Sequence, residues 1–276
     1  MMAAGKKEAE EVGGYKMEIK VLSKDKENKK ISFILKNSNV FFANTLRRMI
    51  LEEVPVLAIE DVDFKENSSA LYDEIVAHRL GLIPIKTDLK SYSLPEECTC
   101  KGKGCAKCTL KLTLQSKSPG IVYAAEIKSK DPKCKPVYGK MPVAKLIKGQ
   151  EIELVATAML GKGKNHAKWT PCWVYYKAYP EIEIKKDCED AAKACPVNVF
   201  DFKQGKLTIN EDNLLKCHLC DACVDACPKG AINVKDSNTD FIFNLESWGQ
   251  LEPQEIVKTA VDEFQKKLAE FEKQLK

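Results

Sequence analysis

Cysteine is the residue whose distribution most restricts what this chain can fold into. The 276 residues include twelve cysteines, and most of them lie in two short stretches, 98–108 and 188–227. No apolar run reaches the ~18 residues of a membrane span, and the first residues lack the apolar region of a signal peptide, so we expect a cytoplasmic protein. In a reducing compartment, clustered thiols favour metal ligation over a disulfide framework.

The second stretch has the spacing of an iron-sulfur site. It fits the pattern C-x2-C-x2-C-x3-C-P with Cys217, Cys220, Cys223, Cys227 and Pro228. This pattern holds 4Fe-4S clusters in bacterial ferredoxins, where the fourth cysteine serves the other cluster of a pair. We therefore predict a ferredoxin-like domain over residues 185–234, with short strands at 197–202 and 206–209.

An upstream copy of this pattern is incomplete. Cys195, which is also followed by proline, marks its end, but the same spacing counted backward reaches Lys185, Cys188 and Ala191. One cluster therefore has a full ligand set, which is Cys195, Cys217, Cys220 and Cys223. The other would have only Cys188 and Cys227, and two thiolates cannot hold a cubane. We predict one 4Fe-4S cluster, with Cys188 and Cys227 left as neighbours that are either free thiols or a disulfide.

The first stretch predicts a second metal. Four thiols lie within eleven positions, and Gly102 and Gly104 between the two pairs permit a tight reversal; the thiols are Cys98, Cys100, Cys105 and Cys108. Four thiolates match a closed tetrahedral zinc site. The C-x-C half is less usual than C-x-x-C, and the alternative is a group of free or redox-active thiols. Because no coordination position stays open, we expect the zinc to be structural.

A helix is predicted over residues 37–55. Ser38 or Asn39 can cap its first amides, and Pro55 ends it. Its main apolar face consists of Phe42, Leu46, Met49 and Ile50, and a second side is also apolar. Two of the chain's three arginines, Arg47 and Arg48, lie here. Paired guanidinium groups suit a contact with a partner, whereas the alternative is a core helix with solvated arginines.

The chain ends in a second long helix after Pro253. Apolar residues recur at spacings of four and three along it, as Val257, Val261, Phe264, Leu268, Phe271 and Leu275. This is a heptad seam. The seam packs either onto the chain's own sheet or onto a partner helix, and we favour the partner.

Alternating apolar and polar residues predict the sheets. Residues 15–23 and 30–35 form a hairpin that leads into the first helix, and residues 171–184 and 240–245 return to the same sheet. The fold class is therefore α+β. We predict a discontinuous domain of residues 1–55, 171–184 and 235–276, into which a β-rich domain (56–170) and the ferredoxin-like domain are inserted.

Composition and local patterns exclude several other functions. The 44 basic and 40 acidic residues leave a net charge of +4, so we expect any contact with nucleic acid to be local or indirect. Asp61 and Asp63 lie in an alternating strand and are followed by Lys65 rather than a third carboxylate, so they do not form a magnesium site. The segment 161–169 lacks phosphate-loop spacing and predicts an exposed basic loop that carries Trp169.

Two long motifs carry a family resemblance. FANTLRRMILEEVP at 42–55 and SALYDEIVAHRLGLIP at 69–84 closely resemble the D subunits of archaeal DNA-directed RNA polymerases. That family is related to the third-largest subunit of eukaryotic RNA polymerase II and to the bacterial alpha subunit, and the resemblance extends from about Tyr15 to the C-terminus. It implies an alpha-subunit-like dimerisation domain and a zinc loop at 98–108.

The resemblance also implies a function. A member of this family has no catalytic residues of its own, pairs with the small subunit L through its first and last helices, and seeds assembly of the large catalytic subunits. The interface residues expected on this basis are Phe42, Leu46, Arg47, Arg48, Val261, Phe264, Leu268 and Phe271. The alternative is a ferredoxin-like electron-transfer or redox-sensing subunit of an oxidoreductase, which leaves both helices without a role and lacks a G-x-G-x-x-G nucleotide site.

Overall fold

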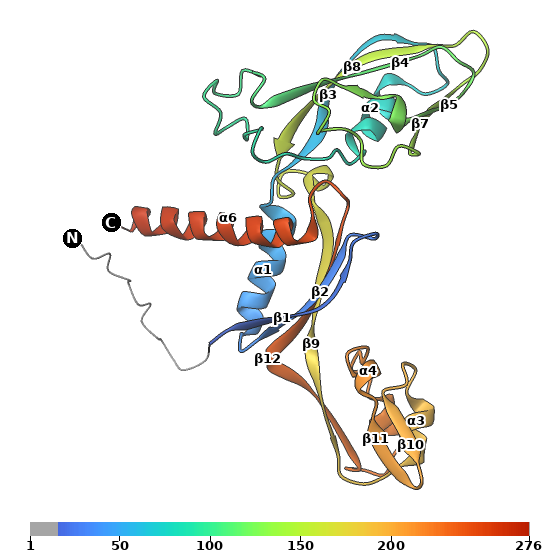
Figure 1. Ribbon diagram of the computed structural model, residues 1–276, viewed down its shortest axis with the longest axis vertical. Helices are drawn as coiled ribbons and strands as arrows, with labels where there is room; N and C mark the ends of the chain where they lie inside the picture. Colours follow the sequence, from blue (N-terminus) through green and yellow to red (C-terminus); the bar gives the residue numbers. More distant parts are fainter. Residues whose placement is uncertain (1–15, 276) are drawn as a thin grey trace. The chain divides into compact units, whose positions relative to one another are not determined.

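The computed structural model describes residues 16–275 of the chain (Figure 1). These residues form two compact units. The first contains residues 16–22, 33–43 and 176–243, and the second contains residues 23–32, 44–175 and 244–275. This division differs from the three domains expected from the sequence, because residues of the discontinuous domain occur in both units. Residues 1–15, which we also expected in that domain, lie outside the described part.

A four-stranded sheet contributes residues to both units. Its strand order is β1-β2-β12-β9, with the bounds Glu18–Asp25, Lys30–Lys36, Ile232–Ser247 and Cys172–Ile184. The expected hairpin and the two returning segments are thus found in one sheet. β9 agrees closely with its predicted range, whereas β12 begins earlier than residue 240 and ends later than residue 245.

The first unit holds the ferredoxin-like part of the chain. Its elements are α3 (Glu189–Ala194), β10 (Phe200–Lys203), β11 (Lys206–Ile209), α4 (Glu211–Leu214) and α5 (Ala222–Asp225). β10 and β11 pair antiparallel, close to the two short strands expected from the sequence. A small core of Ala191, Val199, Phe200, Leu207, Cys223, Ala231 and Ile232 fills this part. Because that core is small, bound metal and cross-links would add substantially to its stability.

The second unit holds the β-rich insertion. One sheet has the order β3-β8-β4-β6, with the bounds Val56–Asn67, Ile152–Gly161, Thr109–Ser116 and Lys128–Ser129. A second, two-stranded sheet pairs β5 (Gly120–Tyr123) with β7 (Pro142–Leu146). The short helices are α2 (Asp73–Gly81), η1 (Ala124–Glu126) and η2 (Ala167–Trp169). Leu57, Leu80, Leu112 and Leu154 lie in its main core and are almost fully buried.

Two longer helices complete the chain. α1 spans Val40–Glu52, and the Asn39 side chain accepts a hydrogen bond of 2.9 Å from the amide of Phe42, so Asn39 is the cap. α6 spans Pro253–Gln274 and begins with proline, which has no amide hydrogen to leave unsatisfied. No helix among residues 16–275 combines the length and the apolar character required to cross a membrane.

The segment 161–169 is exposed only in its middle, at residues 164–167, whereas Gly161 and Trp169 at its two ends are buried. Trp169 is only 8 % exposed, and its indole donates a hydrogen bond to the carbonyl of Met159. The Lys168 ammonium lies 4.5 Å from the ring centroid and also pairs with Glu60. Gly161 must be glycine, because a Cβ there would lie 2.3 Å from the Trp169 ring. The prediction of an exposed loop therefore holds for residues 164–167, but the prediction of an exposed Trp169 is wrong.

Candidate metal centres and helical surfaces

The four cysteines of the first stretch converge on one point. Their Sγ atoms all lie within 4.8 Å of one another. The Sγ–Sγ distances are 3.5 Å for Cys98–Cys105, Cys98–Cys100 and Cys100–Cys108, and 3.9 Å for Cys105–Cys108. Four sulfurs placed tetrahedrally at a zinc–sulfur distance of about 2.3 Å stand about 3.8 Å apart. The thiols therefore have the spacing that a zinc ion requires.

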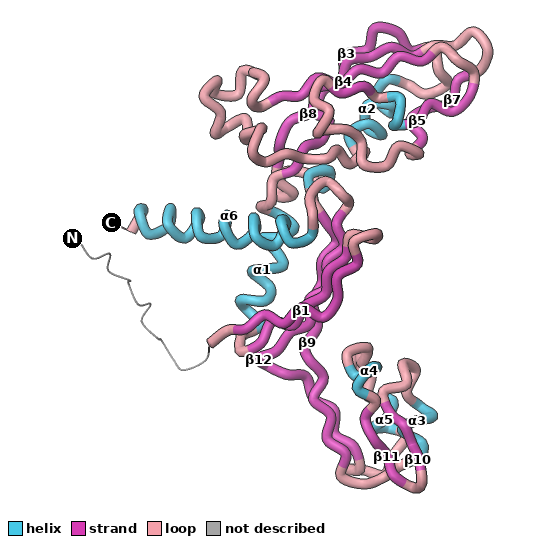
Figure 2. Tube along the Cα trace, viewed as in Figure 1, coloured by secondary structure: helices cyan, strands magenta, loops and turns pink. Residues whose placement is uncertain are grey.

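Backbone conformation explains why this loop can close on itself. It lies in a long irregular stretch between α2 and β4 (Figure 2), and Lys101, Gly102 and Gly104 all have positive φ angles. Two glycines accept this conformation without the steric cost that a side chain adds. The reversal that Gly102 and Gly104 permit brings the C-x-C pair back onto the C-x-x-C pair.

The electrostatics of the thiol group favour a thiolate site. Hydrogen bonds from the Cys105 amide and from neighbouring thiols lower the pKa of Cys100 to about 6, whereas burial raises the pKa of Cys108 to about 12. The same group therefore holds one thiol that loses its proton easily, Cys100, and one that keeps it, Cys108. A divalent cation would supply the charge needed to ionise all four, because metal binding displaces thiol protons.

The iron-sulfur cysteines gather in the small core of the first unit. Cys223 is 8 % exposed, and Cys195 and Cys217 pack against the same cluster of side chains, whereas Cys220 is exposed. Burial, followed by the neighbouring Cys195 and Cys217, raises the pKa of Cys223 to about 11. The sulfur of Cys195 also accepts a hydrogen bond of 3.3 Å from the Val199 amide. Cys195, Cys217 and Cys223 thus lie at one small core, and their joint role as ligands with Cys220 stays a prediction.

The loop that carries the downstream cysteines has an uncommon backbone. Leu219 and Asp221, on either side of Cys220, have φ angles of 57° and 58°. Left-handed residues other than glycine concentrate at ligand-binding sites, where the surrounding structure holds them in place. The donor set and this loop conformation both fit a 4Fe-4S cluster held by Cys195, Cys217, Cys220 and Cys223.

Cys188 and Cys227 are joined by a disulfide, with 6.1 Å between their Cα atoms. Of the two states that the sequence left open, the structure has the bonded one. Both residues occupy ligand positions of the incomplete second site, so their thiols are not available to a second cluster. The remaining cysteines, Cys134 and Cys172, are buried, and burial raises the pKa of both thiols.

The heptad seam of α6 is largely open to solvent. The helix buries Ile256, Ala260 and Glu263 on one face. The adjoining seam residues are exposed by 37 % (Val261), 51 % (Leu268), 61 % (Phe271) and 72 % (Leu275), and Phe264 is half-buried. Exposed apolar residues at heptad spacing are the pattern of a helix that packs on another chain.

The first helix requires one correction. Leu46 was expected at a partner interface, but it is only 7 % exposed and packs inside the chain, because it shares the buried face with Met49 and Ile50. Phe42 is half-buried. Phe41, which was not among the expected interface residues, is 82 % exposed.

Both arginines of α1 are bound to side chains of their own helix. Arg47 donates to the Asn44 side chain at 2.8 and 3.2 Å. Arg48 makes two hydrogen bonds of 3.1 Å to the carboxylate of Glu52. Their guanidinium groups are thus held in defined positions on the surface.

A buried ion-pair network connects the end of α1 with the middle of α6. Lys162, in the segment after β8, contacts Glu53 at 3.3 Å and Glu263 at 2.9 Å. Lys267 reaches Glu53 at 2.9 Å and Lys266 reaches Glu263 at 2.5 Å. The two glutamates are 6 % and 8 % exposed. Neither was singled out from the sequence, because their partners are distant in the chain.

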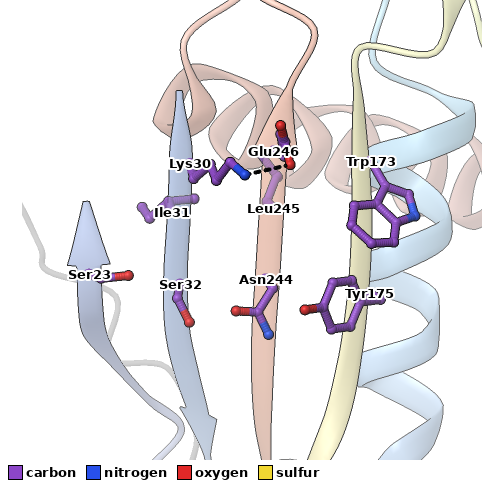
Figure 3. A pocket seen from close by; sticks show the side chains of 9 residues that line it. All are labelled: Ser23, Lys30, Ile31, Ser32, Trp173, Tyr175, Asn244, Leu245 and Glu246. Atoms are coloured by element: carbon purple, nitrogen blue, oxygen red, sulfur yellow. Dashed lines mark ion pairs between the residues drawn. The ribbon is translucent and has the colours of Figure 1, made fainter. Parts of the chain in front are cut away.

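The sheet also presents aromatic rings to solvent. Trp173 and Tyr175 project from β9 toward the same side as the Lys30–Glu246 ion pair of 3.0 Å (Figure 3). The two rings lie 5.0 Å apart and line a shallow depression of about 200 Å³. They are 56 % and 42 % exposed, which follows from the alternation of β9, in which Cys172 and Val174 point inward.

Two family models match parts of the chain. Residues 59–171 match the RNA polymerase Rpb3/RpoA insert domain, which coincides with the β-rich insertion. Residues 186–232 match a 4Fe-4S dicluster domain, which coincides with the ferredoxin-like part. The two matches confirm the α+β fold class and the two inserted modules.

Relatives match almost the whole chain. A protein of Methanosphaera stadtmanae is 40 % identical over 253 residues, which is 87 % of this chain and 92 % of the relative. A protein of Archaeoglobus fulgidus is 38 % identical (93 % and 97 %), and one of Pyrococcus horikoshii is 36 % identical (92 % and 96 %). All three are named DNA-directed RNA polymerase subunit Rpo3. The chain therefore belongs to the Rpo3 family of DNA-directed RNA polymerase subunits.

Proposed function

We propose that this chain is the non-catalytic assembly platform of a cytoplasmic DNA-directed RNA polymerase. It pairs with the small subunit L, and the pair docks the large subunits that carry out nucleotidyl transfer. The observation that carries this proposal is the exposed heptad seam of α6, on which Leu268, Phe271 and Leu275 are each more than half exposed. In the single chain these apolar side chains stay in contact with water and do not stabilise the fold. A partner helix would bury them and gain the corresponding free energy.

The interface is centred on α6. Val261, Phe264, Leu268 and Phe271 supply its apolar part. From α1, Phe42, Arg47 and Arg48 contribute at the edge, where the arginines can exchange their present contacts with Asn44 and Glu52 for groups on the partner. Leu46 is buried on the inner face of α1 and stabilises the packing of this helix within the chain. Contact with nucleic acid is indirect, through the assembled enzyme.

The two metal sites stabilise parts of the chain that have little core of their own. Cys98, Cys100, Cys105 and Cys108 would hold one zinc ion, which would supply a cross-link within the long loop before β4. Cys195, Cys217, Cys220 and Cys223 would hold one 4Fe-4S cluster, and the disulfide of Cys188 and Cys227 takes the place of the second. We assign neither metal a role in the polymerase reaction.

The relatives favour this function over an oxidoreductase subunit, since those compared are named as polymerase subunits. A redox partner would also leave the α6 seam without a role. The iron-sulfur cluster then serves stability and assembly instead of catalytic electron transfer.

Pairing can be tested by charge substitutions on the seam. We expect Leu268→Asp combined with Phe271→Asp to abolish co-purification of the small subunit when both chains are produced together, because two carboxylates would be buried at the interface without partners. Gln265→Asp, at an exposed position of the same helix, is the matched control and should leave pairing intact. An unchanged yield of heterodimer from the double variant would refute the interface.

A further inference from the structure

Lys177 contacts the loop that carries the first downstream cluster ligand. It lies in the part of β9 that belongs to the first unit, together with the whole ferredoxin-like segment. Its ammonium donates hydrogen bonds of 2.7 Å to the carbonyl of Leu215 and 2.8 Å to the carbonyl of Cys217. Both bonds join residues far apart in sequence, at separations of 38 and 40 positions. The strand therefore holds the loop through one side chain.

The two carbonyls mark the beginning of the ligand loop. Leu215 is the C-cap residue directly after α4, and Cys217 is a predicted ligand. Carbonyls at a helix end have no partner within the helix and need one from elsewhere. The Lys177 ammonium provides it, and in doing so fixes the backbone from which the Cys217 sulfur projects.

Burying the Lys177 ammonium costs free energy of desolvation, which its hydrogen bonds must offset. Lys177 is half-buried, so its ammonium has lost part of its contact with water. In place of that water it has the backbone carbonyls of Leu215 and Cys217. A half-buried lysine without a carboxylate partner is uncommon, since its desolvation is otherwise uncompensated.

We propose that Lys177 is a positioning residue for the 4Fe-4S cluster. Its two hydrogen bonds hold the Leu215–Cys217 backbone in the conformation that the ligand needs. Its positive charge stands beside the ligand set, where it favours the negatively charged bound cluster and its reduced state. This role is separate from the assembly function, because it concerns cluster retention by the isolated full-length chain.

The test compares three variants of the full-length chain after anaerobic reconstitution with iron and sulfide. Lys177→Met removes the donors and the charge, Lys177→Arg keeps both, and Lys216→Met removes a neighbouring lysine that is exposed and bound only to Asn213. We expect Lys177→Met to lose its iron in air about tenfold faster than the unmodified chain. Lys216→Met should lose it at the unmodified rate, and Lys177→Arg should lie closer to the unmodified chain than Lys177→Met does.

The reduction potential of the cluster distinguishes the proposed role from a purely structural one. Loss of structure alone would not change the potential according to the charge at position 177. Lys177→Met should have a more negative potential than the unmodified chain, and Lys177→Arg should not. Circular dichroism of the cluster-free proteins checks folding, and if Lys177→Met does not fold, the same comparison is made with Lys177→Gln. Iron retention and potential equal to those of the unmodified chain would overturn the proposal, as would equal losses in the Lys177→Met and Lys216→Met variants.

Discussion

The ammonium nitrogen of Lys162 lies 2.9 Å from the carboxylate of Glu263, and the two residues are 101 positions apart in the chain. This contact ties the segment after β8 to helix α6, and the same ammonium also reaches Glu53 just after α1. Gly163 allows the segment to approach, since a Cβ there would lie 2.0 Å from the carbonyl of Leu51. Lys162 therefore links the residue after α1 to the middle of α6, in addition to the direct Lys267–Glu53 pair.

Removing this lysine should destabilise the chain. Lys162→Met leaves Glu53 and Glu263 buried with only Lys267 and Lys266 as partners, so we expect the free energy of unfolding to fall by about 2 kcal/mol. Chemical denaturation followed by circular dichroism measures it. Lys164→Met, two positions further on and exposed, should change the stability little. Equal stability of the two variants would show that the network contributes nothing.

The same network predicts a pH dependence. Burial alone would raise the pKa of Glu263, but hydrogen bonds from Lys266 and Lys162 outweigh it, so the pKa lies below the ordinary 4.5. Such a carboxyl stabilises the fold fully above pH 4.5, and this contribution is lost as the pH falls through the lower folded value. Burial likewise opposes the rise in the pKa of Lys162, yet its pKa is raised by Glu263 and Glu53. Its contribution is present below pH 10.5 and is lost only as the pH rises through the folded value.

We therefore expect Glu263→Gln to reduce the loss of stability between pH 7 and about pH 3. The control is Glu270→Gln, at an exposed position on the same helix. Unfolding by urea at the two pH values gives the difference. A Glu263→Gln variant whose stability depends on pH as steeply as that of the unmodified chain would contradict the assignment.

We expect the zinc content of the chain to depend on the four converging thiols of residues 98–108. Metal analysis of the purified chain should find about one zinc, and Cys105→Ser should remove most of it, because three thiolates and a hydroxyl form a poorer set. Lys107→Met, in the same loop, should retain the metal. Zinc content that is unaffected by Cys105→Ser would place the metal elsewhere.

Iron should number about four per chain. Cys223→Ser should lose most of it, since it removes the most buried ligand. The paired change Cys188→Ser and Cys227→Ser should keep it, because these sulfurs are bonded to each other. About eight iron atoms in anaerobically purified protein would show that a second cluster forms instead.

Local patterns predicted much of the fold. The Asn39 cap and the start of α6 at Pro253 depend on neighbouring residues alone, and so they can be inferred from the sequence. Metal-ligand spacing is local as well, which is why the Cys98–Cys108 group was recognisable. The position of Cys195 required only the comparison of two copies of one motif.

Contacts between residues far apart in the chain were harder to predict from the sequence. Lys162 looks exposed beside glycines and lysines, yet its ammonium pairs with Glu263, 101 positions along the chain. The alternation of β9 predicts that Lys177 faces solvent. Its contact with the Cys217 loop becomes visible only in the folded chain. Leu46 was placed on the correct apolar face but was expected to meet a partner, because helical periodicity identifies an apolar face without saying what covers it.

Amide hydrogen exchange tests the central proposal most directly. The proposal predicts that residues 261–274 of α6 exchange rapidly near the exposed end in the isolated chain, and become strongly protected when the small subunit is added. Residues of β8, buried within the second unit, should be protected in both states. An α6 seam whose exchange is the same with and without the small subunit would contradict it.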